Sequence, residues 1–308
     1  KTRMSLGRNE PTGDRRRMKV FFHKVHGGNV GDDVNAELWH RLIPELDELA
    51  TADWLIGIGT ILDQRINELP GRKVVMGSGL RPNSIGRLQG DIRIGAVRGL
   101  LSAERLGLDP AVAACDPGFL IGQLWSPASS DAGGIGLIPQ IYSEQWSEIS
   151  RAGVDAGLDV ISPTLPIDRF LQRLRRCARV YSESMHGAIF ADALRIPWAR
   201  VRLTSHYFES AGVSEFKWQD AFSVVGASGA PINRLALLRP KRGAGLVRSL
   251  MRPVQALAEH RLVSALKKRS EDADTFRLSD SARLQAQTRV LLSRIEMLRS
   301  ERDVQGWP

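Results

Sequence analysis

The sequence contains little cysteine and no long apolar run, and both absences narrow the classes of protein it can encode. Only Cys115 and Cys177 occur among 308 residues, too few for a disulfide scaffold or a cysteine-based zinc site, so we expect a reducing compartment. No apolar run reaches the roughly 18 residues of a membrane-spanning helix, and residues 1–19 lack the apolar segment of a secretory signal. We therefore expect neither a transmembrane helix nor a secretory signal.

Motifs for several common chemistries are also missing. No Gly-x-Ser-x-Gly elbow is present, which disfavours a hydrolase of that type. His23 and His26 are not accompanied by further ligands at metal-binding spacing, so we expect no metal site. The glycine-rich turn at residues 26–33 lacks the Gly-Lys-Ser/Thr of a Walker loop and the glycine spacing of the dinucleotide fingerprint. We accordingly expect no bound cofactor.

Positive charge is abundant but unevenly distributed. The chain carries a formal net charge of +9, and residues 234–270 alone hold ten Lys or Arg against one acid, Glu259. A uniform nucleic-acid-binding surface would spread its charge differently, so we expect no nucleic acid partner. A localised basic segment suits an anionic membrane surface or an acidic partner, and a solvated helix face is the alternative.

Short apolar runs that end in glycine or polar residues alternate with helical patterns over most of the chain. This alternation is typical of an α/β fold built on parallel sheets. The predicted strands are residues 18–23, 54–59, 73–79, 91–99, 112–118, 135–139, 158–163, 178–184 and 197–203. Residues 126–134, rich in serine, alanine and glycine, are the clearest linker between two α/β halves.

These patterns divide the chain into four regions. We predict a disordered basic leader at 1–17, an N-terminal α/β lobe at 18–130, a C-terminal α/β lobe at 131–233 and a basic helical tail at 234–308. Met18 is an alternative start, and the tail is expected to be interrupted at Pro240 and Pro253. An amphipathic helix at 276–300 is expected to pack back on the body rather than form a coiled coil. Its apolar positions are Leu284, Val290, Leu291, Ile295 and Leu298.

Polar residues follow several predicted strands, at the ends where such sheets bind ligands. In the turn at 26–33, three glycines allow backbone to approach a ligand, and the helix that follows favours an anion at its N-terminus. His186 lies where the strand at 178–184 turns into a helix, and an imidazole there suits proton transfer near neutrality. Each has a structural alternative, a capped turn for the first and a capping or packing histidine for the second.

Three further strand ends carry weaker signals. Arg98 can hold a phosphate or carboxylate through its fork of donors, or it is a surface arginine. Ser78 and Gly79 can offer backbone N–H groups to an anion, or they form a plain turn. Asp116 is expected to hydrogen-bond within its own Asp-Pro-Gly turn.

Taken in order, these segments resemble the polysaccharide pyruvyl transferase family, and within it the succinoglycan-type and xanthan-type ketal pyruvyltransferases. The resemblance spans about residues 18–225. The matching segments are residues 28–32, 53–59, 75–79, 97–107, 116–118 and 183–197. Each segment alone is a weak signal, but six in the same order are fairly specific.

The resemblance implies a fold, a reaction and a place in the cell. The fold would be two Rossmann-like lobes in a GT-B-like arrangement, with the site in the cleft and a basic helical extension at the C-terminus. The donor would be phosphoenolpyruvate, a co-substrate rather than a cofactor. The acceptor would be a sugar diol on a lipid-linked exopolysaccharide repeat unit, and the product a cyclic pyruvate ketal. Such a bacterial enzyme would be cytoplasmic and peripheral at the inner membrane, with its basic tail on the anionic surface.

The resemblance also implies roles for individual residues. We expect His186 of the rear lobe to face the turn at 29–33 across a positively charged crevice. The residues predicted to be catalytic are His186, Asp32 and Arg98. Those predicted to bind the donor are Arg98, Ser78, Gly79, Ser184, Arg81 and Lys217, and those predicted to bind the acceptor are Asn29, Asp32, Asp33, His26 and Glu183. Ser184 stands where some relatives carry arginine, so the arginine that holds the donor stays open.

Two other classes of function stay open on the sequence. One is a nucleotide-sugar glycosyltransferase of the same two-lobed architecture, because a glycine-rich turn and an arginine would also serve a diphosphate. The other is a non-enzymatic membrane or nucleic-acid tether that uses the basic tail. It leaves the polar strand ends of both halves unexplained.

Overall fold

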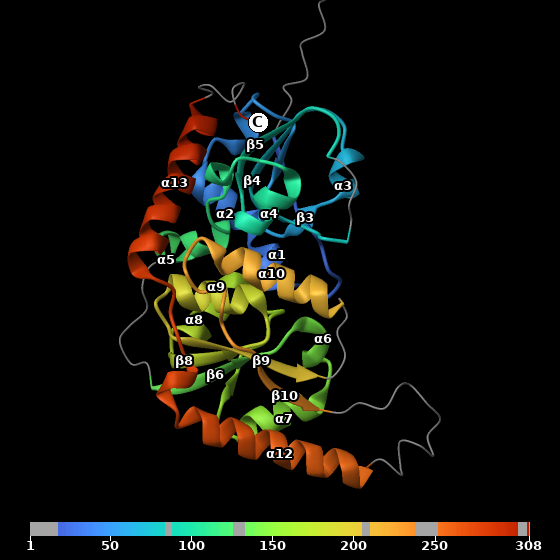
Figure 1. Ribbon diagram of the computed structural model, residues 1–308, viewed down its shortest axis with the longest axis vertical. Coiled ribbons are helices and arrows are strands. Elements are labelled where there is room, and N and C mark those ends of the chain that lie inside the picture. The colour runs from blue at the N-terminus through green and yellow to red at the C-terminus, as the bar shows by residue number, and fades with distance from the viewer. Residues whose placement is uncertain are drawn as a thin grey trace, which may run out of the picture.

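The computed structural model describes residues 18–83, 88–125, 133–204, 210–237, 252–300 and 307. These residues form two five-stranded parallel β-sheets, one above the other along the long axis and each flanked by helices (Figure 1). The predicted α/β class with parallel strands is confirmed. The predicted leader, residues 126–132 of the predicted linker and residues 238–251 of the predicted tail lie outside the described residues.

The first sheet is built on one long central strand. Strand β4 (Lys73–Leu80) is buried at every residue, as expected of a parallel strand covered on both faces. The strands around it run in the order β1-β2-β4-β3, with β5 also paired to β4, all in parallel. Their bounds are β1 (Lys19–Phe21), β2 (Trp54–Ile56), β3 (Thr60–Leu62) and β5 (Ile92–Val97), and the helices are α1 (Val30–Asp33), α2 (Asn35–Leu42), α3 (Gln64–Asn67) and α4 (Leu100–Leu106), with the 3-10 turn η1 (Leu46–Glu48).

The second sheet runs in the order β10-β9-β8-β6-β7, again all parallel. Its strands are β6 (Gly134–Ile138), β7 (Asp159–Val160), β8 (Cys177–Ser182), β9 (Trp198–Thr204) and β10 (Asn233–Leu237). Its helices are α6 (Ile141–Glu144), α7 (Ser147–Asp155), α8 (Ile167–Leu174), α9 (Met185–Ala193) and α10 (Ala211–Ser223). Strand β10 carries this sheet beyond the boundary predicted at residue 233, because it adds an edge strand beside β9.

The strand predicted at 112–118 is wrong. The chain forms two 3-10 turns there, η2 (Pro110–Val112) and η3 (Pro117–Leu120), followed by α5 (Ile121–Leu124). Each 3-10 turn begins with a proline after a capping aspartate, Asp109 or Asp116. Between the two turns only an isolated parallel bridge remains, from Ala113 to Val97, because the flanking proline-started turns leave too short a run for a strand.

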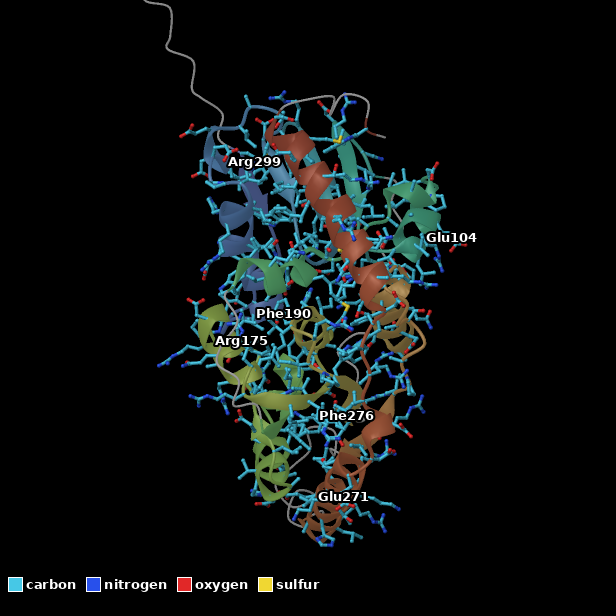
Figure 2. All side chains as sticks on the ribbon, turned by 90° about the vertical axis from the view of Figure 1, so that its left-hand side faces the viewer. Glu104, Arg175, Phe190, Glu271, Phe276 and Arg299 are labelled. Carbon is cyan, nitrogen blue, oxygen red and sulfur yellow. The ribbon has the colours of Figure 1, made fainter. Side chains whose placement is uncertain are left out.

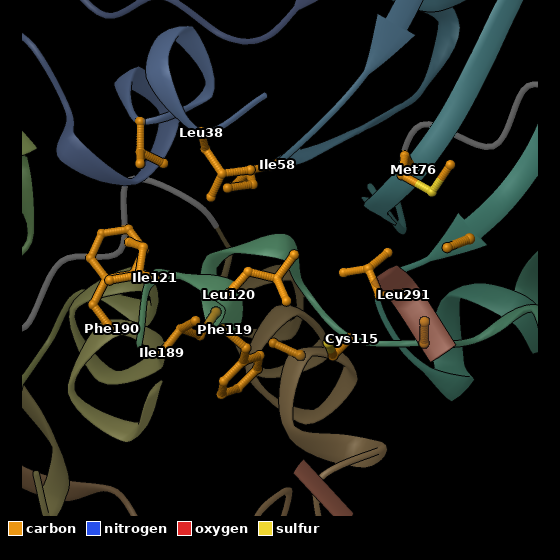
Figure 3. Packing of buried hydrophobic residues seen from close by; sticks show 14 of the residues in the cluster. Leu38, Ile58, Met76, Cys115, Phe119, Leu120, Ile121, Ile189, Phe190 and Leu291 are labelled. Atoms are coloured by element: carbon orange, nitrogen blue, oxygen red, sulfur yellow. The ribbon is translucent and has the colours of Figure 1, made fainter. Parts of the chain in front are cut away.

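One apolar cluster spans both lobes, and a second lies within the second lobe beneath α7 and α12. The segment Phe119–Ile121 lies between residues of the first lobe, such as Ile58, and Ile189 and Phe190 of α9 (Figure 3). Phe119 also meets Phe222 of α10 edge to face, with ring centroids 5.8 Å apart. The two lobes are therefore joined by shared packing as well as by the chain.

The C-terminal helices divide between the two ends of the molecule. Helix α12 (Arg252–Ser270) packs on α7 and β10, and the short turn η4 (Ala273–Thr275) leads on to α13 (Ser281–Arg299). Helix α13 returns to the first lobe and packs on β4, β5 and η3 (Figures 1 and 2). Of the apolar positions predicted for it, Val290 is exposed and the other four are buried. No helix among the described residues combines the length and apolarity needed to cross a bilayer.

Candidate functional site

The glycine-rich turn of the first lobe contacts the second lobe directly. Gly27 and Gly28 have φ values of +92° and +89°, a region that favours glycine. The Val30 N–H then donates to the Pro163 carbonyl over 2.7 Å, which fixes the start of α1 against the second lobe.

Three polar side chains close this turn. The Asn29 N–H donates to Asp33 Oδ2, and Asn29 Nδ2 donates to Asp32 Oδ2, each over 2.6 Å. Asp33 is exposed, whereas Asp32 is buried at 9% relative exposure. Of the two aspartates, Asp32 lines the cavity described below.

His186 stands at the start of α9 and packs on this turn. The Ser184 hydroxyl caps α9 by accepting from the Gly187 N–H. A Cβ built on Gly31 would overlap the His186 ring, with Nδ1 as the nearest atom, so glycine is required for this approach. The ring also stacks on Phe190, which Figure 2 labels at the junction of the lobes. The predicted juxtaposition of His186 and the turn is confirmed, and the chemical role of each residue stays a prediction.

A cavity of about 100 Å³ lies between these elements. Its lining residues come from both lobes: Asn29, Asp32, Thr60, Gln140, Ile141, Ser184, Met185, His186 and Lys217. The charged side chains among them are Lys217 and Asp32, with His186 as the titratable imidazole, so the crevice is of mixed charge rather than positive throughout.

The carboxyl group of Asp32 is perturbed by this setting. Burial raises its pKa above the ordinary value of 3.8. Part of the rise is offset by groups that favour the charged form, namely His186, Lys217, His23 and the hydrogen bond from Asn29. A cavity-facing carboxyl with a raised pKa is a candidate for proton transfer or for binding hydroxyl groups.

Arg98 lies behind the cavity. Its guanidinium is fully buried over Gly79, with Nε 3.0 Å from Asp220 Oδ2 on α10. Nη1 donates to Thr60 Oγ1 over 2.8 Å, and Thr60 lines the cavity. Nη2 has no hydrogen-bond partner among the described residues. Arg98 is therefore no surface arginine, and it reaches the cavity through Thr60.

Other residues of the predicted set are placed away from the cavity lining. Ser78 is buried and donates to the carbonyls of Ile56 and Gly57. Arg81 is half-buried just beyond the end of β4, and His26 is exposed.

Glu183 serves the backbone of its own lobe. Its carboxylate oxygens accept from the Leu203 N–H over 2.8 Å and the Gln140 N–H over 3.1 Å. Burial raises the pKa of Glu183, and these hydrogen bonds oppose the rise. The structure thus gives this carboxylate a partner on each side of β8.

Sequence reasoning missed four of the lining residues, namely Thr60, Gln140, Ile141 and Met185. Thr60 begins β3 directly after the glycines at 57 and 59, and Gln140 follows the end of β6. The strand-end rule that found Asn29 and His186 also applies to these two positions. Within the described residues, no group of three or more His, Cys, Asp or Glu is arranged to hold a metal ion.

Comparison with known proteins identifies the family of the chain. Residues 96–203, which include Arg98 and His186, match the polysaccharide pyruvyl transferase family. The chain is 32% identical over 224 residues to the succinoglycan biosynthesis protein ExoV of Rhizobium meliloti (strain 1021), an alignment that covers 70% of this chain and 67% of that protein. No solved structure matches the chain. The family match and the relative identify the chain as a transferase enzyme. The chain belongs to the polysaccharide pyruvyl transferase family.

Proposed function

We propose that this enzyme transfers the pyruvyl group of phosphoenolpyruvate to a sugar diol during exopolysaccharide synthesis. The product is a cyclic pyruvate ketal, and the acceptor is a lipid-linked repeat unit. The observation that carries the proposal is that His186 and Asp32, from opposite lobes, line one small cavity together with Lys217. Membership of the family and the name of the succinoglycan biosynthesis relative support it.

The reaction requires proton transfers at defined atoms. One sugar hydroxyl adds to C2 of phosphoenolpyruvate while C3 gains a proton and becomes a methyl group. The C2–O bond to phosphate then breaks, and the second hydroxyl closes the ketal. The proton of the first hydroxyl ends on C3, and the proton of the second leaves with the released phosphate. We assign the proton transfers to His186, where a positioned acid or base contributes about 10²–10⁴-fold. Asp32 contacts the acceptor hydroxyls.

The donor is a small anion with one phosphate and one carboxylate, and the cavity suits it. Lys217 and the N-terminus of α9 offer positive charge and N–H donors to its phosphate and carboxylate. Arg98, whose charge is paired with Asp220, orients the Thr60 hydroxyl at the cavity. The cavity measures about 100 Å³ and has polar residues of both lobes in its lining.

We also propose that the two lobes form a GT-B-like arrangement. The support is that cavity residues from both lobes follow the carboxyl ends of parallel strands. Asn29 lies beyond β1, Gln140 beyond β6 and Ser184 beyond β8. Ligands bind at this edge in open α/β sheets, and two such edges face each other here.

We further propose that the basic tail holds the enzyme on the anionic inner face of the membrane, where a lipid-linked acceptor resides. Helix α12 exposes Arg261, Lys267 and Lys268. It also exposes the apolar side chains of Val254 and Leu257, so the helix offers both charge and apolar surface to a bilayer.

One assay tests the proposed reaction. Purified protein is incubated with phosphoenolpyruvate and a candidate glycolipid, and phosphate release is measured together with product mass. We expect phosphate release that depends on the glycolipid and a product that gains pyruvate less water. Turnover of a nucleotide sugar, with none of phosphoenolpyruvate across a panel of acceptors, contradicts the proposal.

A further inference from the structure

Asp116 and His186 face each other inside the protein. Asp116 Oδ2 lies 3.5 Å from His186 Nε2, and the two residues are 0% and 8% exposed. Neither atom has a hydrogen-bond partner among the described residues. Buried polar atoms are nearly always paired, so two unpaired atoms that face one another require an explanation.

The turn that carries Asp116 is held rigidly from both lobes. Asp116 Oδ1 accepts from the Gly118 N–H over 2.9 Å, which satisfies the turn with one oxygen only. Pro117 packs on Gly77 of β4, where a Cβ would lie 2.5 Å from the proline Cδ. Gly118 packs on Phe190 of α9, where a Cβ would lie 3.0 Å from the ring. The second oxygen, Oδ2, is therefore fixed opposite the imidazole and is not needed for the turn.

We propose that Asp116 is a positioning residue for His186. It accepts the Nε2–H of the imidazole and so fixes the tautomer in which Nδ1 carries the lone pair. Nδ1 is the ring atom nearest to Gly31, and the neighbours of Gly31 in the turn, Asn29 and Asp32, line the cavity. A neutral imidazole has one N–H and one acceptor nitrogen, so holding the proton on Nε2 leaves Nδ1 free to exchange protons with substrate.

The 3.5 Å contact is at the outer limit of hydrogen-bond length. Catalytic hydrogen bonds are often long in the empty state and shorten in the complex. The other charged groups at this place, Asp32 and Lys217, line the cavity. Asp116 is the carboxylate paired with Nε2. The proton transfer by His186 rests on the proposed function, whereas the control of its tautomer by Asp116 does not.

The substitution Asp116→Asn tests this role. Asparagine keeps an oxygen for the Gly118 N–H and turns its NH₂ toward Nε2, which forces the proton onto Nδ1. We expect kcat to fall at least about tenfold with KM for phosphoenolpyruvate little changed, because the imidazole then presents the wrong nitrogen. The control is Asp109→Asn, which alters the same kind of Asp-Pro cap at an exposed position and should leave kcat unchanged.

Two further measurements separate positioning from a structural role. In a His186→Gln background, Asp116→Asn should cause no additional loss, because its effect passes through the imidazole. Nitrogen-15 NMR of labelled histidine should show His186 protonated on Nε2 in the native protein and on Nδ1 in Asp116→Asn. If Asp116→Asn does not fold, the same measurements are made on Asp116→Ser, which retains a capping oxygen without the carboxylate.

The outcomes distinguish this inference from the proposed function. Additive losses in the double variant, or an unchanged tautomer in Asp116→Asn, overturn the positioning role. If the native enzyme does not use phosphoenolpyruvate, the proposed function fails. The NMR comparison then decides the role of Asp116 without any activity.

Discussion

Arg98 and Asp220 form a fully buried ion pair that ties the end of β5 to α10. The Nε–Oδ2 distance is 3.0 Å, and both side chains are 0% exposed. Asp220 also accepts from the N–H and the hydroxyl of Ser102. The pair thus organises the region directly behind Thr60 and the cavity.

Removing one partner of this pair should be costly. We predict that Asp220→Ala lowers the free energy of unfolding by about 3–5 kcal/mol, because it leaves the Arg98 charge buried and unpaired. Glu37→Ala, which breaks the exposed i,i+4 pair with Arg41, should cost at most about 0.5 kcal/mol. Urea unfolding measures both. Equal effects of the two substitutions contradict the prediction. Arg98→Ala likewise leaves the Asp220 carboxylate buried without its cationic partner. The activity loss of Arg98→Ala must therefore be compared with that of Asp220→Ala.

Loss of the imidazole should abolish most activity without unfolding the protein. We predict that His186→Gln lowers turnover at least about 100-fold, since it removes the group assigned to proton transfer. His40→Gln on the exposed face of α2 should retain native turnover. Steady-state rates with far-UV circular dichroism check both variants. Native turnover in His186→Gln removes the residue from the mechanism.

Gly31 should tolerate no side chain. In Gly31→Ala the new methyl group overlaps the His186 ring, and we predict a loss of about 1–3 kcal/mol in stability together with reduced turnover. Gly212→Ala on α10 has open space at its Cβ and should be neutral, or stabilising by up to about 1 kcal/mol. Thermal unfolding and activity assays compare the two. Unchanged activity in Gly31→Ala would show that the ring can move without consequence.

Asp32 should make stability fall as the pH rises. Its pKa is higher in the folded protein than the ordinary 3.8, so the folded state binds this proton more tightly than the unfolded chain does. The stability from this group is present below 3.8 and is lost as the pH rises through the folded pKa. We predict that Asp32→Asn is more stable than the native protein at neutral pH, loses that advantage in acid and turns over more slowly. Urea unfolding across a pH series tests the sign, and a destabilised variant at neutral pH refutes it.

The charge on α12 should govern membrane binding. Each cation near an anionic surface contributes about 1 kcal/mol, so Lys267→Glu with Lys268→Glu should weaken binding to anionic vesicles at least about tenfold. Arg283→Glu with Arg289→Glu, two exposed positions on α13, serves as the matched control. Reversing charges is preferable to deleting 234–270, because that deletion removes β10 and α12. Equal binding by both double variants would contradict the membrane proposal.

Local sequence patterns predicted much of the fold because each pattern depends on neighbouring residues. Buried parallel strands appear as short apolar runs, and glycine and polar residues indicate the turns after β1 and β8. Thr60 was missed because β3 follows β2 so closely that residues 54–62 look like one strand and its turn.

The parts of the site that sequence could not predict depend on distant partners. The burial of Arg98 follows from Asp220, which lies 122 residues further along the chain. The second oxygen of Asp116 finds its partner on α9, 70 positions away in the sequence. The local sequence correctly predicted Asp116 as a turn residue, because Oδ1 accepts from the Gly118 N–H. It could not predict the residue that Oδ2 faces.

The return of α13 to the first lobe has a consequence for synthesis on the ribosome. Arg294 donates to the carbonyls of Gly95 and Val112, and Arg299 pairs with Glu45, so the lobe that is translated first is completed by residues that emerge near 299. Domains usually fold as units in order of translation. Here the first lobe is translated before α13, so its apolar face beneath α13 stays uncovered until the second lobe has been made.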